Sequence, residues 1–283
     1  MKETRLYNDY SENVNFAHTK SEQCNVDIHL HDSYEIFMAL SSNIRYHIEG
    51  RAYDLNIYDV IITNEKEIHR PSTIAPGPYE RRFVQFKPMI FYNFFSESYN
   101  PLNMFKKREL GKNNKIALSE QDYGPINAIF EELEQLFKNR SAKNMVVAKS
   151  LILRLISELE EAYLKNVSPE EEGIVIDERI ENIIAELNQN YDKPFSLDEV
   201  SRRHFMDKYY LCHLFKEVTG FSLMEYVQSK RIQQAKMLIS QGMGIMEAAR
   251  ISGFDEYSNF YKTFSKLVKM PPKKYKDVII AES

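Results

Sequence analysis

Short apolar runs separated by turn-forming residues predict β-strands in the first third of the chain. The breaks between the runs hold residues such as Gly50 and the Pro-Gly-Pro cluster at 76–78. Short, closely spaced strands are typical of an antiparallel barrel or sandwich, and a small closed barrel fits this pattern best. The expected strands cover 27–31, 35–40, 44–49, 60–63 and 82–86.

Two stretches of helical periodicity follow, on either side of a polar break at 139–141. Apolar residues recur at helical spacing in each stretch, so we expect two amphipathic helices that form a hairpin. Their broad apolar faces can cover the barrel, meet a second subunit, or do both, and we expect a homodimer. The apolar positions are Ile126, Ile129, Phe130, Leu133, Leu136 and Phe137 in the first helix and Val146, Val147, Leu151, Leu155, Ile156 and Leu159 in the second.

A polar stretch at 166–173, with Ser168-Pro169 and three glutamates, divides the chain. It has the composition of a linker. We therefore predict an α+β chain with a barrel and helical hairpin at 1–167, a linker at 168–174 and an all-α domain at 175–283. The expected helices of the second domain cover 177–191, 197–204, 208–218, 223–240, 245–251, 256–267 and 272–276.

Capping residues mark the boundaries of these helices. A serine followed three residues later by glutamate has the spacing of a capping box, and an aspartate before a helix can cap it alone. Gly220 and Gly253 stand where helices should stop. The expected caps are Ser196 with Glu199 and Ser222 with Glu225 as boxes, and Asp207 and Asp255 as single caps.

The helical region contains two units of helix-turn-helix form, at 196–220 and 245–267. In each, a short helix and a tight break precede a helix with one apolar side, made by Leu211 and Phe215 in the first and by Phe260 and Phe264 in the second. The opposite sides carry residues that can reach base edges or phosphates from the major groove. These are Lys208, Tyr209, Cys212, His213 and Lys216 in the first unit and Tyr257, Ser258, Asn259 and Lys262 in the second.

Charge is distributed unevenly along the chain. Residues 202–276 hold 14 lysines and arginines against 6 acidic residues, whereas residues 1–201 hold 23 against 33. A basic segment on an otherwise acidic protein indicates a polyanionic partner for that segment. The sequence has no apolar run of membrane-spanning length and no signal peptide, so we expect a cytoplasmic protein without a membrane partner. Cys24 and Cys212 are far apart and imply no disulfide.

At the helix-turn-helix residues the sequence resembles the AraC family of bacterial transcription regulators. The pattern spans roughly a hundred residues at fixed spacings, with Asp207 where the family has a serine cap, Ser201 where it has alanine and Lys269 where glycine is frequent. The resemblance implies sequence-specific binding to double-stranded DNA. The matching positions are Leu197, Val200, Tyr210, Leu211, Leu214, Phe215, Lys216, Thr219, Gly220, Tyr226, Arg231, Ala235, Leu238, 245–249, Gly253, Phe254, Phe260, Phe264, Pro272 and Tyr275.

The resemblance also assigns roles on the reading helices. It implies that Tyr209, Cys212 and His213, with the four residues named on the second helix, read bases. It leaves Arg231 with an internal structural role. Most protein–DNA contacts position the protein rather than specify sequence. The candidates for phosphate contacts or structural pairs are Arg202, Lys216, Lys230, Lys266 and Lys274.

A second cluster, in the predicted barrel, holds His29, His31, Glu35 and His69. It resembles the metal motif of cupins, whose nitrogen and carboxylate ligands suit a divalent ion. Three interpretations stay open: a metal-free sensor site, a metal-containing sensor, and a metalloenzyme with a helical tail. We expect the metal-free sensor and no cofactor, because regulators of the resembling family often carry a cupin-like sensor barrel.

Arg81 and Phe83 alternate onto one face of a late strand, together with Gln85. An arginine that binds a carboxylate or hydroxyl of the ligand, and a ring that stacks on a sugar face, would form an effector site together with the histidine cluster. The competing interpretation is that Phe83 only fills the barrel and Arg81 pairs with an acid. A carbohydrate effector is implied by the family alone.

These features favour a transcription regulator controlled by a small-molecule effector, with RNA polymerase as a partner if it activates. Activation and repression are not distinguished. The alternatives are the metalloenzyme and a constitutive DNA-binding protein whose barrel only dimerises. No nucleophile set, phosphate loop or dinucleotide fingerprint occurs, so we expect no enzymatic activity and no catalytic residues.

Overall fold

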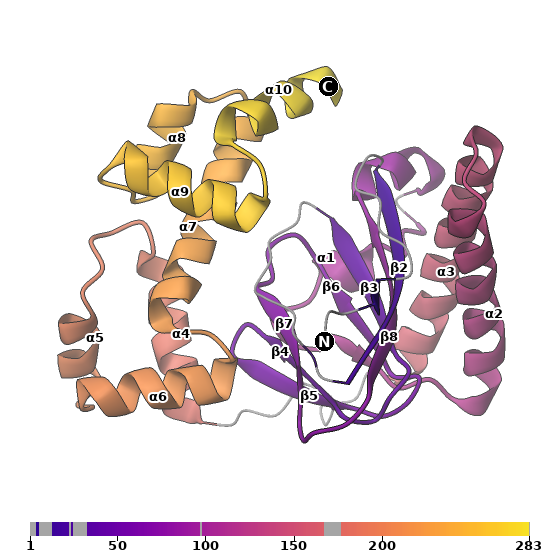
Figure 1. Cartoon of the computed structure of the whole chain (residues 1–283), viewed down its shortest axis with the longest axis horizontal. Coiled ribbons are helices and arrows are strands. Elements are labelled where there is room, and N and C mark those ends of the chain that lie inside the picture. The colour runs from indigo at the N-terminus through magenta and orange to yellow at the C-terminus, as the bar shows by residue number, and fades with distance from the viewer. Residues whose placement is uncertain are drawn as a thin grey trace.

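A computed structural model of the chain describes residues 4–5, 13–22, 24, 33–96, 98–166 and 177–282. It confirms the α+β class, with antiparallel strands first and helices afterwards (Figure 1). The helical hairpin stands on one side of the strands and the C-terminal helices lie on the other (Figure 1). The predicted linker 168–174 and the predicted strand 27–31 lie outside the described residues. Within the described ranges, no helix is both long and apolar enough to cross a bilayer.

The strands form two antiparallel sheets, with orders β1-β2-β8-β3-β6-β9 and β5-β4-β7. The structure confirms four predicted strands, with ends that agree to within three residues: 35–40, 44–49, 60–63 and 82–86. Sequence analysis missed β2, which is rich in polar residues, β7, which contains Pro71, β5, and the two-residue strands β1 and β9. The strands are β1 Thr4–Arg5, β2 Val14–Ser21, β3 Tyr34–Ala39, β4 Ile44–Ile48, β5 Arg51–Leu55, β6 Val60–Thr63, β7 His69–Thr73, β8 Tyr79–Phe86 and β9 Lys115–Ile116.

Both faces of the larger sheet are covered, so every residue of β3 is buried. Ile36 and Met38 belong to an outer core that the hairpin helices complete, whereas Phe37 and Ala39 belong to a core inside the barrel. Alternation along the strand places these pairs on opposite faces. The hairpin consists of α2 Glu120–Lys138 and α3 Ala142–Asn166. The apolar side of the hairpin therefore covers the barrel, which is one of the roles that the sequence analysis expected for it. Contact with a second subunit stays a prediction.

A tight turn joins β4 to β5. The pairing of Ile48 with Arg51 leaves Glu49 and Gly50 as a two-residue loop. Both have positive φ, 48° and 84°, as a type I′ turn requires. Glycine adopts this conformation freely, but glutamate is strained in it by about 1 kcal/mol or more. Such strain persists only where other contacts hold the residue in place.

The C-terminal region is helical throughout its described residues. Six of the predicted helices agree with the observed ones within about a residue at each end, but the last extends to Glu282 rather than 276. Short segments η1 Pro88–Phe94 and α1 Asn103–Lys106 lie beside the barrel. The C-terminal helices are α4 Glu178–Asn190, α5 Leu197–Arg203, α6 Lys208–Thr219, α7 Leu223–Ser240, α8 Ile245–Ile251, α9 Tyr257–Val268 and α10 Pro272–Glu282.

Two of the four predicted caps are confirmed. Ser222 forms a complete capping box with Glu225, and Asp207 accepts hydrogen bonds from the first N–H groups of α6. The box at Ser196 is wrong, because its side chain makes no capping hydrogen bond. The cap at Asp255 is also wrong, because Glu256 occupies that position without a capping bond. The spacing of serine and glutamate alone did not distinguish a capping box whose hydrogen bonds form from one whose hydrogen bonds do not.

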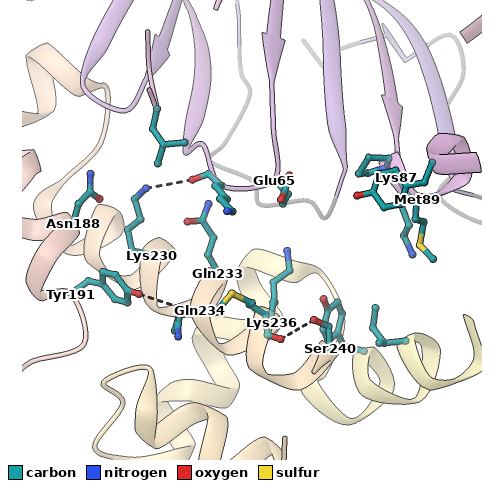
Figure 2. A pocket seen from close by; sticks show the side chains of 17 residues that line it. Glu65, Lys87, Met89, Asn188, Tyr191, Lys230, Gln233, Gln234, Lys236 and Ser240 are labelled. Carbon is teal, nitrogen blue, oxygen red and sulfur yellow. Dashed lines mark hydrogen bonds between the residues drawn. The ribbon is translucent and has the colours of Figure 1, made fainter. Parts of the chain in front are cut away.

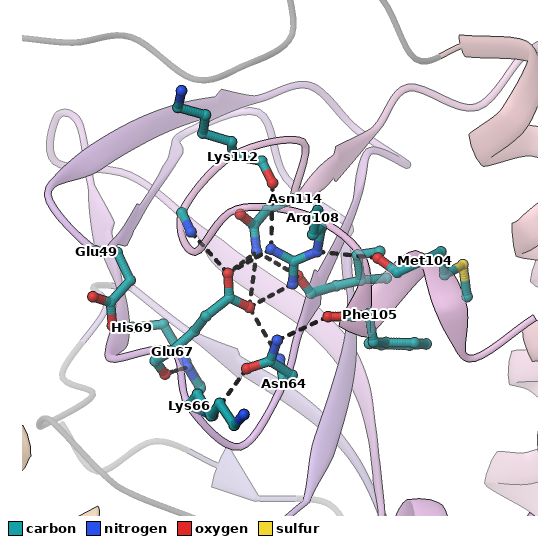
Figure 3. A network of polar contacts seen from close by, with 12 residues as sticks. Glu49, Asn64, Lys66, Glu67, His69, Met104, Phe105, Arg108, Lys112 and Asn114 are labelled. Atoms are coloured by element: carbon teal, nitrogen blue, oxygen red, sulfur yellow. Dashed lines mark hydrogen bonds and ion pairs between the residues drawn. The ribbon is translucent and has the colours of Figure 1, made fainter.

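A buried ion pair holds the loops at one end of the barrel together (Figure 3). Glu67 has a fully buried side chain, and its two oxygens lie 2.5 Å from the two terminal nitrogens of Arg108. The backbone N–H groups of Asn64 and Gly111 also donate to this carboxylate, at 3.0 and 2.9 Å. Burial alone would raise the pKa of Glu67, but the Arg108 charge and these donors hold the pKa below its usual value.

We expect Glu67→Gln to destabilise the protein by about 3 to 5 kcal/mol, because it leaves the Arg108 charge buried without its counter-ion. Thermal and urea unfolding of the full chain would measure the loss. Glu109→Gln is the matched control, since Glu109 forms an exposed pair with Lys112 and exposed pairs contribute little. Equal stability of the two variants would contradict a structural role for the buried pair.

Candidate nucleic-acid interface and barrel interior

The first helix-turn-helix unit consists of α5 and α6. Leu211 and Phe215 lie on the inner side of α6 and are fully buried, so the opposite side of α6 faces outward. Of the predicted DNA contacts, Lys208, Tyr209, His213 and Lys216 are exposed and Cys212 is half-buried. The exposed fraction of Tyr209 is 79%. The structure therefore brings these five side chains to one helix surface that is accessible to a partner.

The turn between α5 and α6 contains Phe205, which sequence analysis did not select. Phe205 has φ 52° and is 97% exposed, so a large apolar ring stands in solvent beside the start of α6. Tyr210 is 47% exposed, and its hydroxyl accepts a hydrogen bond from Arg179 at 3.2 Å. Ser201, which replaces the family's alanine, donates to the Met206 carbonyl at 2.7 Å, so its buried hydroxyl is satisfied.

The second unit consists of α8 and α9. Phe260 and Phe264 are fully buried, and Tyr257, Ser258, Asn259 and Lys262 are all exposed on the other side of α9. Asn259 accepts a 3.4 Å hydrogen bond from Thr263, one turn further along the helix. Both predicted reading surfaces are thus formed and accessible.

Two positive-φ residues follow α8 and α9, the two helices of this unit. Gly253 has φ 88°, and a Cβ there would lie 2.5 Å from the Asp192 carbonyl oxygen, so only glycine lets the two segments approach. Lys269 ends α9 at φ 61°, in the conformation that glycine favours. The family's frequent glycine at this position therefore has a backbone reason, and lysine is strained there.

The basic residues of the region divide between exposed and internal roles. Arg231 donates to the Tyr191 carbonyl at 2.7 Å and to the Lys193 carbonyl at 2.8 Å, the internal role that the family resemblance implies. Lys208 lies 2.9 Å from the Asp198 carboxylate on α5. Lys230 lies toward the barrel (Figure 2) and is 7% exposed. Lys230 is therefore a structural pair rather than a phosphate contact.

The hairpin tip of the barrel attaches directly to the helices. Lys230 Nζ lies 2.8 Å from both oxygens of Glu49, and the Tyr226 hydroxyl donates to Glu49 Oε2 at 2.8 Å. The Ile68 N–H donates to Glu49 Oε1 at 2.6 Å. Beside Glu49, a Cβ on Gly50 would lie 1.9 Å from Ile184 Cδ1 of α4. These contacts hold the Glu49 side chain and so stabilise the strained turn.

A second contact joins β4 to the end of α6. The buried ring of His47 donates from Nδ1 to the Val218 carbonyl at 3.2 Å, and its Nε2 lies 3.0 Å from the Ser72 hydroxyl. Burial lowers the pKa of His47 to about 4, and the positive charges of Arg70 and Arg45 lower it further. The hydrogen bond to the Val218 carbonyl acts in the opposite direction, because it favours the protonated ring. The ring is neutral at physiological pH, and the neutral form satisfies both contacts.

The predicted barrel site is described only in part, because His29 and His31 lie outside the described residues. Glu35 is buried and accepts hydrogen bonds from Tyr46 and Gln85, each at 2.8 Å. His69 Nδ1 donates to the Glu67 carbonyl at 2.9 Å, and its ring stacks on that of Tyr46. Among the described residues, no group of three or more potential ligands could hold a metal ion.

Arg81 and Phe83 face the barrel interior, as alternation predicted. Arg81 is 5% exposed, donates to the Thr19 hydroxyl at 3.1 Å and lies over the rings of Phe37, Tyr79 and Phe83. Its guanidinium lies 4.9 Å from the Phe83 ring centre. The structure therefore brings Arg81 and Phe83 into contact and surrounds the cation with aromatic faces.

Sequence comparisons with known proteins match the helical region. A family model described as a helix-turn-helix domain matches residues 200–277. The multiple antibiotic resistance protein MarA of Escherichia coli is 32% identical over 98 residues, which are 34% of this chain and 77% of MarA. The melibiose operon regulatory protein of E. coli is 26% identical over a region that covers 34% of this chain and 32% of that protein. A solved structure of apo ToxT from Vibrio cholerae covers 96% of this chain and 99% of its own, with 14% identity and a TM-score of 0.42.

We expect stability to fall as the pH drops from about 6.5 toward 4, because the unfolded chain binds a proton at position 47 that the folded chain excludes. The difference between the ordinary pKa of 6.5 and the folded pKa of about 4 for His47 corresponds to a loss of about 3 kcal/mol at the acid end. His47→Gln should remove this part of the pH dependence, measured as unfolding free energy against pH. His213→Gln, on the exposed side of α6, is the control and should leave the profile unchanged. Parallel profiles for the wild type and His47→Gln would contradict the assignment.

Proposed function

The chain belongs to the AraC family of transcription regulators, and from that premise we propose that its two reading helices recognise one DNA site under the control of an effector. It is a DNA-binding transcription regulator and not an enzyme. The observation that carries the proposal is the pair of exposed, polar helix surfaces on α6 and α9, which the same buried core holds in place. The long helix α7 connects the two units (Figure 1).

The reading residues differ in the information that they can supply. An asparagine can bond two adjacent edges of an adenine, and a lysine on the same surface can bond a guanine or a phosphate. We propose base contacts for Tyr209, Cys212, His213, Tyr257, Ser258 and Asn259, and base or phosphate contacts for Lys208, Lys216 and Lys262. Phosphate contacts set affinity and its salt dependence, whereas base contacts set specificity.

The barrel interior is the proposed effector site. Arg81 supplies a cation held between rings, and Glu35 on β3 and His69 on β7 supply polar atoms from the two sheets. His29 and His31 are proposed to complete the site. The family favours a sugar, whose hydroxyls and flat faces suit these groups. The alternative is a constitutive regulator with a filled barrel, which the burial of Phe83 would also fit.

The remaining parts of the proposal concern partners and place. We propose that the protein acts as a homodimer in the cytoplasm, so that four helix-turn-helix units meet paired half-sites on DNA. If the regulator activates, RNA polymerase is its further partner. An effector can shift the population of dimer arrangements only by its differential affinity for them.

Genomic affinity selection with the purified full chain tests DNA recognition. At physiological salt we expect a site with two half-elements about one helical turn apart.

The Asn259→Ala variant should lose its preference at one base pair, and the free energy of binding to the preferred site should weaken by about 1 to 3 kcal/mol. Lys143→Gln, on an exposed part of α3, should leave the selected motif unchanged. Uniform weakening across all sequences by Asn259→Ala would assign Asn259 to phosphate, and no enrichment with folded wild-type protein would contradict the proposed recognition.

Ligand-induced thermal stabilisation tests the effector site. We expect one member of a panel of monosaccharides to raise the melting temperature of the full chain, since binding to the folded state alone stabilises it. Arg81→Met should remove the shift while the unliganded protein still unfolds cooperatively. Arg154→Met, on the exposed side of α3, is the control and should keep the shift. Binding that survives Arg81→Met would place the sugar outside the barrel, and no shift with any sugar would favour the constitutive alternative.

A further inference from the structure

The turns of the two helix-turn-helix units have the same backbone structure. In each turn two consecutive N–H groups donate to carbonyls three and five residues earlier, and the first of the two residues has positive φ. This is the Schellman arrangement that closes a helix end. Phe205 in the first unit and Gly253 in the second therefore occupy equivalent positions. The four bonds run from Phe205 to Arg202 at 3.2 Å, from Met206 to Ser201 at 3.0 Å, from Gly253 to Arg250 at 3.1 Å and from Phe254 to Ala249 at 3.1 Å.

The residues at these equivalent positions differ in how well they suit the turn. Gly253, at φ 88°, adopts the left-handed conformation freely. Phe205, at φ 52°, is strained in it, because a bulky side chain disfavours positive φ. The ring of Phe205 is 97% exposed, so it adds almost no packing in return.

The phenylalanine is also not needed to form the turn, because glycine makes the same two backbone bonds in the second unit. Backbone strain that brings no gain in packing is typical of positions that serve a function. We therefore looked for a partner that the exposed ring could contact.

The ring of Phe205 stands at the edge of the proposed reading surface of α6. Asp207 caps α6 two residues further on, and Tyr209 is exposed in the first turn of the helix. When such a unit docks, the first residues of the second helix reach base edges while the first helix crosses the backbone. The turn between them then lies beside the major groove, and the basic character of residues 202–276 favours DNA as the partner.

The chemistry of a phenyl ring limits what it can recognise on DNA. It has no hydrogen-bond donor or acceptor with which to contact the polar atoms of the bases. The apolar group on the base edges of the major groove is the C5-methyl group of thymine. Contact with that methyl group would distinguish thymine from the other bases at one position.

We propose that Phe205 contacts the C5-methyl group of a thymine and so extends the reading surface of α6 by one base pair. The inference rests on the DNA recognition proposed above. It explains why a strained, solvent-exposed ring stands in the first unit where the second unit has glycine.

The test uses the full chain and the duplex that the wild type selects from genomic DNA. Each thymine of that duplex is replaced in turn by deoxyuridine, which differs only in lacking the C5-methyl group. One replacement should weaken wild-type binding about fourfold, as expected for the loss of one buried methyl group. Fluorescence anisotropy at fixed salt would measure it. The same replacement should not affect binding by Phe205→Gly, because glycine has no ring to contact the methyl group.

Stability and a matched variant complete the design. Phe205→Gly should melt at an equal or higher temperature than the wild type, because glycine releases the strain of the turn. Tyr58→Gly is the control, since Tyr58 is an aromatic residue at φ 75° that is 36% exposed but lies between β5 and β6 of the barrel. This variant should respond to deoxyuridine as the wild type does.

Three outcomes would count against the inference. An identical response of the wild type and Phe205→Gly at every thymine would overturn it and leave DNA recognition standing. Uniform weakening of all duplexes by Phe205→Gly would assign the ring to the sugar–phosphate backbone and would also overturn it. A folded wild type that selects no duplex would contradict the DNA recognition on which the inference rests.

Discussion

The buried carboxylate of Glu49 receives Lys230, Tyr226 and a backbone N–H at the point where the barrel meets the helices. An ion pair removed from water is stable only when its geometry is good and its remaining oxygens and protons are satisfied. Here three donors converge on one carboxylate, which also holds the turn in its left-handed conformation. The orientation of α7, and with it both helix-turn-helix units, is therefore coupled to a β-hairpin of the barrel.

The barrel itself is constrained by coverage of both sheet faces. The hairpin helices bury the outer face, and the inner face closes around Phe37, Tyr46 and Phe83. Polar groups inside are held by specific hydrogen bonds, as at Glu35, and also by ring faces, as at Arg81. A packed interior of this kind resists continuous deformation.

The DNA-binding region could be predicted from sequence almost completely, because its structure follows from local periodicity. The apolar spacing of α6 and α9 determines which side chains face out, and Asp207 and Ser222 mark helix starts through bonds to nearby backbone. The box at Ser196 failed because spacing does not determine side-chain direction. Contacts between distant segments left no local signal: Glu49 and Lys230 are 181 residues apart. The strand β2 escaped prediction for the same reason, because its polar residues face the barrel interior and other charged groups.

The contact of Ile184 with Gly50 determines how closely the two halves can pack. The isoleucine methyl occupies the space where any other residue at position 50 would carry its Cβ. A side chain at position 50 would therefore force α4 away from the barrel, so the join between the halves depends on the one residue that has no Cβ.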